Sequence, residues 1–230
     1  MPRLDVWLVE SGQFSSRQAA KRAIKDGNVT VDGYPCKPSK QVTGNESIQL
    51  LVNHTDNPKG FQKLKMIDDI ISGNLVVPPC IALDIGSSAG GFLAYLGHRG
   101  ARATGIEIST RFTKELQILV DSNPNLSIMY ADAFEIEPSS LFDEGSLDLL
   151  LVDVTTDSAG TLSLICMYSP LLKIGGRLVA AFKINKNAQN VLQVIESIQK
   201  MGFEDIKDIN LDDARQEVHI IACRTEATFY

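Results

Sequence analysis

The segment Leu83-Asp84-Ile85-Gly86-Ser87-Ser88-Ala89-Gly90-Gly91-Phe92 decides the fold that this sequence predicts. An apolar run ends in Asp-x-Gly-x-x-x-Gly-Gly, which is typical of a strand that turns into a helix beside a bound ligand. Glycine permits the positive φ and the close backbone approach that such a turn needs, and the first amides of the next helix point at the ligand. The segment does not match the dinucleotide fingerprint, because Ser88 stands where that fingerprint needs its second glycine.

Apolar runs alternate with helical patterns on both sides of this segment. The apolar runs predict strands at residues 81–84, 103–106, 126–129, 147–152, 177–182, 203–209 and 218–222. Helical patterns lie between them at 91–96, 111–120, 159–172 and 189–201. This alternation predicts an α/β fold, with a mostly parallel, Rossmann-like sheet of seven strands and helices on both faces. The last two strands are close in sequence, which fits a reversed final strand.

Two acidic residues follow the next two strands of this predicted sheet. Glu107 follows the second strand, 23 residues after Asp84, and Asp132 follows the third. A carboxylate in the first place accepts hydrogen bonds from ribose hydroxyls in other nucleotide-binding α/β units. The second carboxylate could accept a hydrogen bond from an adenine amino group. Together the two acids predict a crevice that binds a nucleoside.

The glycine-rich turn and the two acids resemble the S-adenosylmethionine-binding motifs of class I methyltransferases. The resemblance extends from Ile81 to Ala222 and implies S-adenosyl-L-methionine as the cofactor. The fold leaves the methyl acceptor open, because one fold serves many reactions. The cofactor contacts that the resemblance implies are Asp84, Gly86, Ser87, Ser88, Gly90, Gly91, Phe92, Glu107, Ile108, Asp132, Ala133 and Asp153.

Four further charged residues stand near strand ends that converge on the same crevice. Lys63 precedes the first strand, Asp153 and Lys183 end the fourth and fifth, and Glu217 precedes the last. The set resembles the catalytic tetrad of the RrmJ/FtsJ family of ribose 2′-O-methyltransferases. A ribose hydroxyl is a poor nucleophile, so the resemblance implies that Lys183 acts as the general base. Burial and the like charge of Lys63 favour the neutral form of Lys183, whereas Asp153 and Glu217 favour its charged form, so the balance stays open.

The first lysine of this set has a competitor. The resemblance rests on Gly60-Phe61-Gln62-Lys63-Leu64, in which Phe61 replaces a glycine of the family's Gly-Gly-x-Lys-Leu. Lys65 therefore remains a second candidate for that position.

The residues from Arg3 to Leu51 predict a separate small domain. A helix at 4–10 and a second helix that opens at Ser15-Ser16 precede Gly27-Asn28-Val29-Thr30-Val31-Asp32-Gly33, which predicts a helix stop, a strand and a hairpin turn. The second helix carries a basic stripe and, at Ala20, Ala23 and Ile24, an apolar face.

The order of these pieces resembles the RNA-binding domain named after ribosomal protein S-four. The resemblance implies an α+β domain over residues 1–52, a linker over 53–60 and a methyltransferase domain over 61–230. The two domains together resemble the TlyA family of rRNA 2′-O-methyltransferases, historically called hemolysins, so the implied partner is RNA, either rRNA or ribosomal subunits. The implied RNA contacts are Arg3, Arg17, Lys21, Arg22 and Lys25.

Composition limits the other classes. With 44% hydrophobic and 22% charged residues and no long apolar run, the sequence predicts a globular protein that does not enter a membrane. Its first residues lack a secretory pattern, so we expect a cytoplasmic protein. Four scattered cysteines and three scattered histidines predict no metal site. The net charge of −6 restricts any nucleic-acid surface to a local basic patch.

Three other functions remain as alternatives. The first is a non-catalytic RNA- or ribosome-binding protein that keeps the cofactor fold, although the cofactor acids and the tetrad are present. The second is hemolysin-like lysis, which the lack of a long apolar segment for insertion disfavours. The third is base methylation, which normally uses a cysteine or an Asn/Asp-Pro-Pro-aromatic motif, whereas this chain has Asp153-Val154-Thr155-Thr156. The chain also has Ile184-Asn185-Lys186-Asn187 where TlyA-like proteins have Pro-Gln-Phe-Glu, which leaves the RNA target open.

Overall fold

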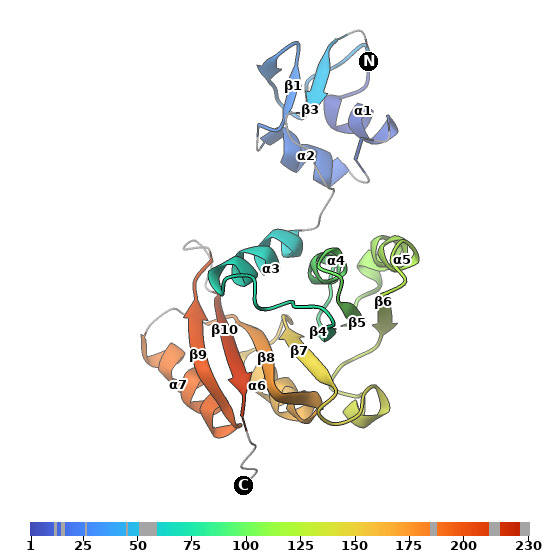
Figure 1. Cartoon of the computed structure of the whole chain (residues 1–230). Helices are drawn as coiled ribbons and strands as arrows, with labels where there is room; N and C mark the ends of the chain where they lie inside the picture. Colours follow the sequence, from blue (N-terminus) through green and yellow to red (C-terminus); the bar gives the residue numbers. More distant parts are fainter. Residues whose placement is uncertain are drawn as a thin grey trace. The chain divides into compact units, whose positions relative to one another are not determined.

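The computed structural model describes residues 1–11, 13–14, 17–25, 27–44, 46–50, 59–184, 188–211 and 217–225. The chain divides into two compact units, Met1–Pro58 and Lys59–Tyr230, which are coloured blue and teal to red in Figure 1. Among the described residues, no helix is long and apolar enough to cross a membrane.

The first unit packs two helices against a small antiparallel sheet. Asp32 and Gly33 both have positive φ, 55° and 82°, as the predicted Asp-Gly hairpin turn requires. The predicted apolar face of the second helix is buried, while Ser15 and Ser16 lie outside the described residues. The elements are α1 (Leu4–Glu10), α2 (Arg17–Lys25), β1 (Val29–Val31), β2 (Tyr34–Pro35) and β3 (Ile48–Leu50), with the strand order β2-β1-β3.

The second unit is built on a seven-stranded sheet, as predicted. Its order is β6-β5-β4-β7-β8-β10-β9, and neighbouring strands from β6 to β8 are parallel. The reversed final strand is also confirmed, because β10 is antiparallel to both β8 and β9. The strands are β4 (Ile81–Ile85), β5 (Arg102–Glu107), β6 (Leu126–Tyr130), β7 (Leu147–Val152), β8 (Leu172–Phe182), β9 (Phe203–Ile209) and β10 (Val218–Arg224).

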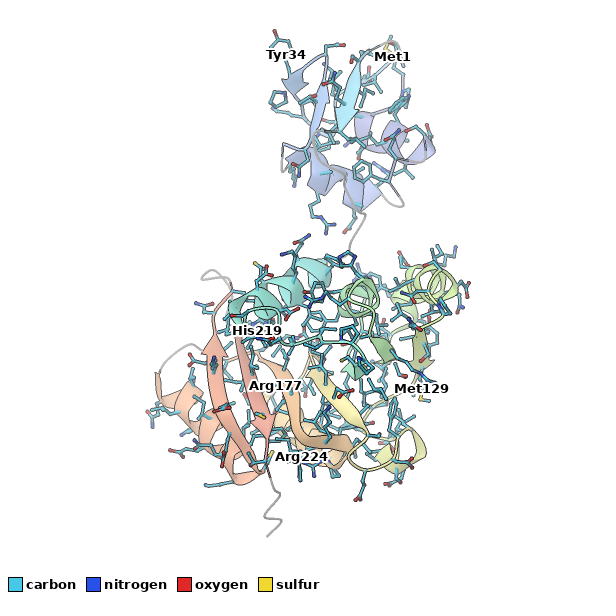
Figure 2. All side chains as sticks on the ribbon, in the orientation of Figure 1. Met1, Tyr34, Met129, Arg177, His219 and Arg224 are labelled. Atoms are coloured by element: carbon cyan, nitrogen blue, oxygen red, sulfur yellow. The ribbon has the colours of Figure 1, made fainter. Side chains whose placement is uncertain are left out.

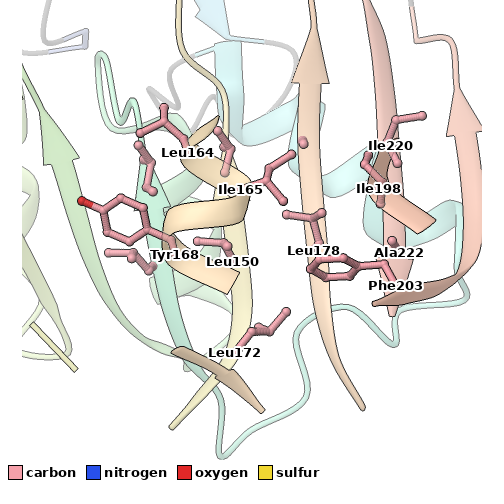
Figure 3. Close-up of a cluster of buried hydrophobic side chains, with 14 of the residues drawn as sticks. Leu150, Leu164, Ile165, Tyr168, Leu172, Leu178, Ile198, Phe203, Ile220 and Ala222 are labelled. Atoms are coloured by element: carbon pink, nitrogen blue, oxygen red, sulfur yellow. The ribbon is translucent and has the colours of Figure 1, made fainter. Parts of the chain in front are cut away.

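Helices cover both faces of this sheet (Figure 1). One face carries α3 (Lys59–Ile70), α4 (Gly91–His98) and α5 (Thr113–Asp121), and the other carries α6 (Ser158–Tyr168) and α7 (Ala188–Lys200). Strand residues alternate between the two faces, so each face has its own apolar core. Figure 3 shows the core under α6 and α7, where Leu164, Ile165 and Tyr168 pack with Leu150 and Leu178.

Three sequence predictions of element bounds were wrong. The helix predicted at 159–172 ends at Tyr168, because Pro170 lacks a backbone N–H, and a 3-10 turn (Ser169–Leu171) follows. The next strand begins at Leu172 instead of 177. The helix predicted at 111–120 is divided between a 3-10 turn (Thr110–Phe112) and α5. The predicted linker lies outside the described residues up to 58, and its last two residues open α3, a helix that was not predicted.

Candidate active site

The turn between β4 and α4 is shaped by its backbone. Gly86, Ser88 and Gly90 all have positive φ, and Gly90 precedes α4 in the left-handed conformation. A Cβ atom at Gly86 would lie 2.4 Å from the carbonyl oxygen of Asp153, at the end of β7. Glycine at position 86 is therefore required both by its φ and by the close approach of β7.

Asp84, the residue before the last one of β4, has an unpaired carboxylate. The side chain is fully buried, and neither carboxylate oxygen has a hydrogen-bond partner among the described residues. Burial raises the pKa of Asp84 to about 7, and the negative charges of Asp153 and Glu107 add to the rise. Because an unpaired buried carboxylate is costly, Asp84 suits a ligand that brings a cationic group to this turn.

The raised pKa of Asp84 predicts how stability depends on pH. Between about pH 4 and pH 7 the folded protein keeps a proton on Asp84 that the unfolded chain has lost, so the free energy of unfolding falls as the pH rises through this range. We expect Asp84→Asn to remove this fall, on the order of a few kcal/mol, in urea unfolding measured at several pH values. Asp132→Asn, which changes a less buried carboxylate, should leave it in place. If the free energy of unfolding changes with pH in the same way in wild type and in Asp84→Asn, the raised pKa of Asp84 is contradicted.

Glu107, at the end of β5, stabilises the turn between β4 and α4 through hydrogen bonds. Its Oε2 accepts a hydrogen bond from the backbone N–H of Ser88 and its Oε1 accepts one from that of Ser109, both at 2.7 Å. Each carboxylate oxygen retains a second lone pair that can accept from a hydroxyl. Asp132 accepts from the backbone N–H of Phe134 at 2.9 Å.

Two apolar side chains lie beside these acids in the sequence and reach solvent. Ile108, which was predicted as a cofactor contact, is 67% exposed, and Phe134, which was not, is 40% exposed. Exposed apolar side chains next to nucleoside-type acceptors suit a flat heterocycle. The sequence feature that could have identified Phe134 as a candidate contact is its position two residues after Asp132.

Lys63 of α3 connects two carboxylates from distant parts of the sheet. Its Nζ atom lies 2.7 Å from Asp153 Oδ2 and 2.7 Å from Glu217 Oε1. The three side chains are between 13% and 23% exposed, so solvent screens them only partly. Lys65, the competing candidate, pairs instead with Asp69 on the exposed side of the same helix. The structure thus brings Lys63, and not Lys65, to these carboxylates.

Lys183 ends β8 apart from this ion-pair cluster. Its Nζ atom donates hydrogen bonds to the carbonyl oxygen of Val154 at 2.8 Å and to Thr155 Oγ1 at 3.1 Å. The expectation that Lys183 is buried was wrong: the side chain is exposed, because it lies at the open carboxyl end of β8. Among the described residues, no carboxylate forms an ion pair with it. Residues 185–187, where the sequence departs from the TlyA pattern, lie outside the described residues.

A buried polar network holds α3 against α4. Asp68 of α3 is fully buried and accepts hydrogen bonds from Tyr95 Oη at 2.7 Å, from Arg99 Nη1 at 2.6 Å and from the backbone N–H of Leu75 at 2.9 Å. Arg99 also donates to the carbonyl oxygens of Gly73 and Val76. This network fixes the helix that carries Lys63.

Close backbone contact between Gly60 and Gly91 gives a second prediction. A Cβ atom at Gly91 would lie 2.5 Å from Gly60 Cα, whereas one at Gly60 would lie 3.1 Å from Gly91 Cα. Gly91→Ala should therefore push α3 away and lower the free energy of unfolding by about 1–3 kcal/mol. Gly60→Ala is the matched control and should lower the free energy of unfolding clearly less. Equal losses in thermal or urea unfolding would contradict this close packing.

Three of the five predicted RNA contacts, Arg3, Arg17 and Lys21, cluster around an acid that was not predicted as a site residue. Asp5 of α1 is fully buried, and its carboxylate lies 2.9 Å from Arg3 Nε, 3.1 Å from Arg17 Nη2 and 3.7 Å from Lys21 Nζ. Burial acts to raise the pKa of Asp5, but the hydrogen bonds from Arg3 and Arg17 outweigh it and lower that pKa. The three cations are 42% to 53% exposed, and Lys25 is also exposed. One acid thus gathers three cations at the surface of the first unit.

Comparison with protein families and curated proteins agrees with these two units. Residues 2–48 match the S4 domain, and residues 83–180 match a methyltransferase domain. The chain is 24% identical, over 89% of its length and 81% of the relative, to the 16S/23S rRNA (cytidine-2′-O)-methyltransferase TlyA of Mycobacterium tuberculosis. It is 25% identical, over 62% of its length and 64% of the relative, to a fibrillarin-like rRNA/tRNA 2′-O-methyltransferase of Saccharolobus islandicus.

Solved structures show the same fold. A putative hemolysin from Streptococcus thermophilus superposes with a TM-score of 0.61 at 22% identity, over 98% of this chain and 89% of that one. Aeropyrum pernix fibrillarin with natively bound S-adenosyl-L-methionine superposes with a TM-score of 0.55 at 21% identity, over 84% and 87%. The second unit is therefore a class I methyltransferase fold, joined to an S4 domain.

Proposed function

We propose that this chain, which joins an S4 domain to a class I methyltransferase domain and is a homologue of TlyA, transfers a methyl group from S-adenosyl-L-methionine to a ribose 2′-hydroxyl of RNA. The observation that carries the proposal is the meeting of Lys63 with Asp153 and Glu217 at the sheet edge where β8 ends in Lys183. The curated relatives from two different groups are both ribose methyltransferases by name.

The residues of the turn fit this cofactor. The unpaired carboxylate of Asp84 is available to a cationic group, and Glu107 is placed for ribose hydroxyls. Ile108 and Phe134 would flank the adenine, and Asp132 would accept from its amino group. When bound, the cofactor supplies an electrophilic methyl group on a sulfonium.

We assign Lys183 the role of general base, which takes the proton from the attacking hydroxyl. Among the described residues no carboxylate pairs with Lys183, and Asp153 and Glu217 both pair with Lys63. Val154 O and Thr155 Oγ1 accept hydrogen bonds from Lys183 Nζ and hold it in place. Lys63 offsets one of the two negative charges of the cluster, and Lys183 would move the proton.

The first unit supplies the affinity for RNA in this proposal. Its exposed cations would contact phosphates, which positions structured RNA without reading its sequence. The TlyA homologue favours rRNA, free or within ribosomal subunits, as the acceptor.

The direct test is transfer of labelled methyl to rRNA and to ribosomal subunits, followed by digestion to nucleosides. We expect the label in 2′-O-methyl nucleosides. Label in a base would instead show base methylation. Binding of S-adenosyl-L-methionine without transfer to any RNA would favour a non-catalytic ribosome-binding protein, and robust leakage of liposomes would favour lysis.

The basic surface gives a third prediction. Replacing Lys21 and Lys25 by Gln should weaken RNA binding and should reduce the slope of log K against log salt by about one for each lost phosphate contact. Lys65→Gln is the control, because it removes an exposed lysine of the second unit, outside the S4 domain. Filter binding at several salt concentrations measures both slopes. An unchanged slope in the double variant would show that this face of α2 does not contact RNA phosphates.

A further inference from the structure

His219 is a buried side chain next to the proposed catalytic cluster. It lies on β10, between Ala181 of β8 and Ile209 of β9, and is only 2% exposed (Figure 2). Ile221, two residues along, belongs to the apolar core under α3 and α4, so His219 points to the same face. Lys63 approaches from α3 on that face.

His219 faces the same carboxylate oxygen that Lys63 binds. Its Nε2 atom lies 3.1 Å from Glu217 Oε1, and Lys63 Nζ lies 2.7 Å from the same oxygen. The approach is not aligned as a full hydrogen bond, and neither ring nitrogen has another partner among the described residues. A buried imidazole N–H without any other acceptor would be costly, so Glu217 is the group that compensates it.

The electrostatics of Glu217 lead to the same pair of residues. Contact with His219 is the largest influence that holds the pKa of Glu217 well below its usual range, and Lys63 adds to it against the opposing effect of burial. Glu217 thus stays ionised although it is only 13% exposed. Two nitrogen atoms on different elements, His219 Nε2 on β10 and Lys63 Nζ on α3, thus lie within 3.1 Å of a single carboxylate oxygen.

We propose that His219 is a positioning residue, which donates its Nε2–H to Glu217 and so keeps that carboxylate where Lys63 binds it. The inference rests on the proposed function. With Glu217 fixed, Lys63 holds both carboxylates, and Lys183 stays without an anionic partner. Without His219 the Glu217 side chain can turn away from Lys63, and the charge distribution around Lys183 changes.

Three substitutions of His219 separate positioning from packing. His219→Gln can place an amide N–H near the position of Nε2, whereas His219→Asn places it near Nδ1 and His219→Leu has none. We expect His219→Asn and His219→Leu to lower kcat about tenfold to a hundredfold, with KM for RNA unchanged. His219→Gln should recover most of that loss. If Gln is no better than Leu at equal folded fraction, the positioning role is wrong.

Ile221→Ala is the matched structural control. It opens a cavity on the same strand and the same face, so it should lower the unfolding temperature. Its kcat per folded molecule should stay at the wild-type value, because Ile221 has no contact with Glu217. A loss of kcat equal to that of His219→Leu would assign the effect of both changes to general loosening of β10.

A measurement without RNA keeps this inference separate from the proposed function. Imidazole ¹⁵N NMR at neutral pH reports which ring nitrogen of His219 carries the proton. We expect the proton on Nε2 in wild type and a changed Nε2 signal in Glu217→Gln. A proton on Nδ1 alone would overturn the inference even if RNA methylation is found. The expected tautomer would support it even if the acceptor is another molecule.

Discussion

Lys183→Ala is expected to reduce methyl transfer to RNA at least about a hundredfold, which corresponds to roughly 2.7 kcal/mol of activation free energy. The variant loses the amine that, in the proposed mechanism, takes the proton of the attacking hydroxyl, while the turn at Asp84 and Glu107 stays intact. Single-turnover transfer of labelled methyl measures the rate. Equilibrium binding of S-adenosyl-L-methionine should be unchanged, since the hydrogen bonds described for Lys183 go to Val154 O and Thr155 Oγ1 and not to Asp84, Glu107 or Asp132.

Two further variants test the role of Lys183 as a base. Lys183→Arg keeps the positive charge but hardly ever loses its proton, so it should be nearly as inactive as Lys183→Ala. Lys173→Ala removes a lysine from the opposite end of the same strand, where it pairs with Asp148, and should keep full activity. An active Lys183→Arg would show that the charge, and not the proton transfer, is what Lys183 contributes.

Asp68→Ala should have the largest effect on stability, a loss of about 3–5 kcal/mol in the free energy of unfolding. The substitution removes the acceptor of three hydrogen bonds from a fully buried site and leaves the Arg99 guanidinium without its carboxylate. Urea unfolding measures the loss. Because the network holds α3, kcat should fall together with stability.

Asp69→Ala is the neighbouring control for this prediction. Asp69 is 59% exposed and, within the described part of the chain, pairs with Lys65 one turn away, as an ordinary surface ion pair. Such a pair contributes up to about 0.5 kcal/mol. A loss as large as that of Asp68→Ala would mean that α3 is stabilised by its exposed side and not by the buried network.

Much of the second unit could be predicted from sequence because its signals are local. The strand that ends at Asp84, the glycine turn after it and the alternation of apolar runs each follow from neighbouring residues. The helix α3 was missed although Phe61, Leu64 and Ile67 recur at helical spacing and are buried. Because the residues before α3 are polar, the first two residues of α3 were assigned to the predicted linker.

The partners within the site could not be predicted, because they depend on packing between distant elements. The choice between Lys63 and Lys65 follows from which side of α3 meets the sheet, and that side is set by the contact of Gly60 with Gly91. A lone histidine such as His219 on an apolar strand gives no signal of its own in the sequence.

The first unit shows the same limit. Counting basic residues found the cations of α2, but their convergence on Asp5 depends on how α1 packs against α2. A charge count cannot show that several cations lie around one acid, and it cannot show that this acid is buried.

The reversed direction of β10 also affects how the protein matures. A parallel final strand would begin at the far edge of the sheet, whereas this one begins beside the ends of β7 and β8 and so delivers Glu217 to Lys63 and Asp153. Lys63 and Glu217 are far apart in the sequence, and contacts of that kind form late and slowly. During synthesis the turn after β4 leaves the ribosome well before Glu217. The cluster of Lys63, Asp153 and Glu217 can therefore form only when nearly the whole chain has been made and the last strand has docked.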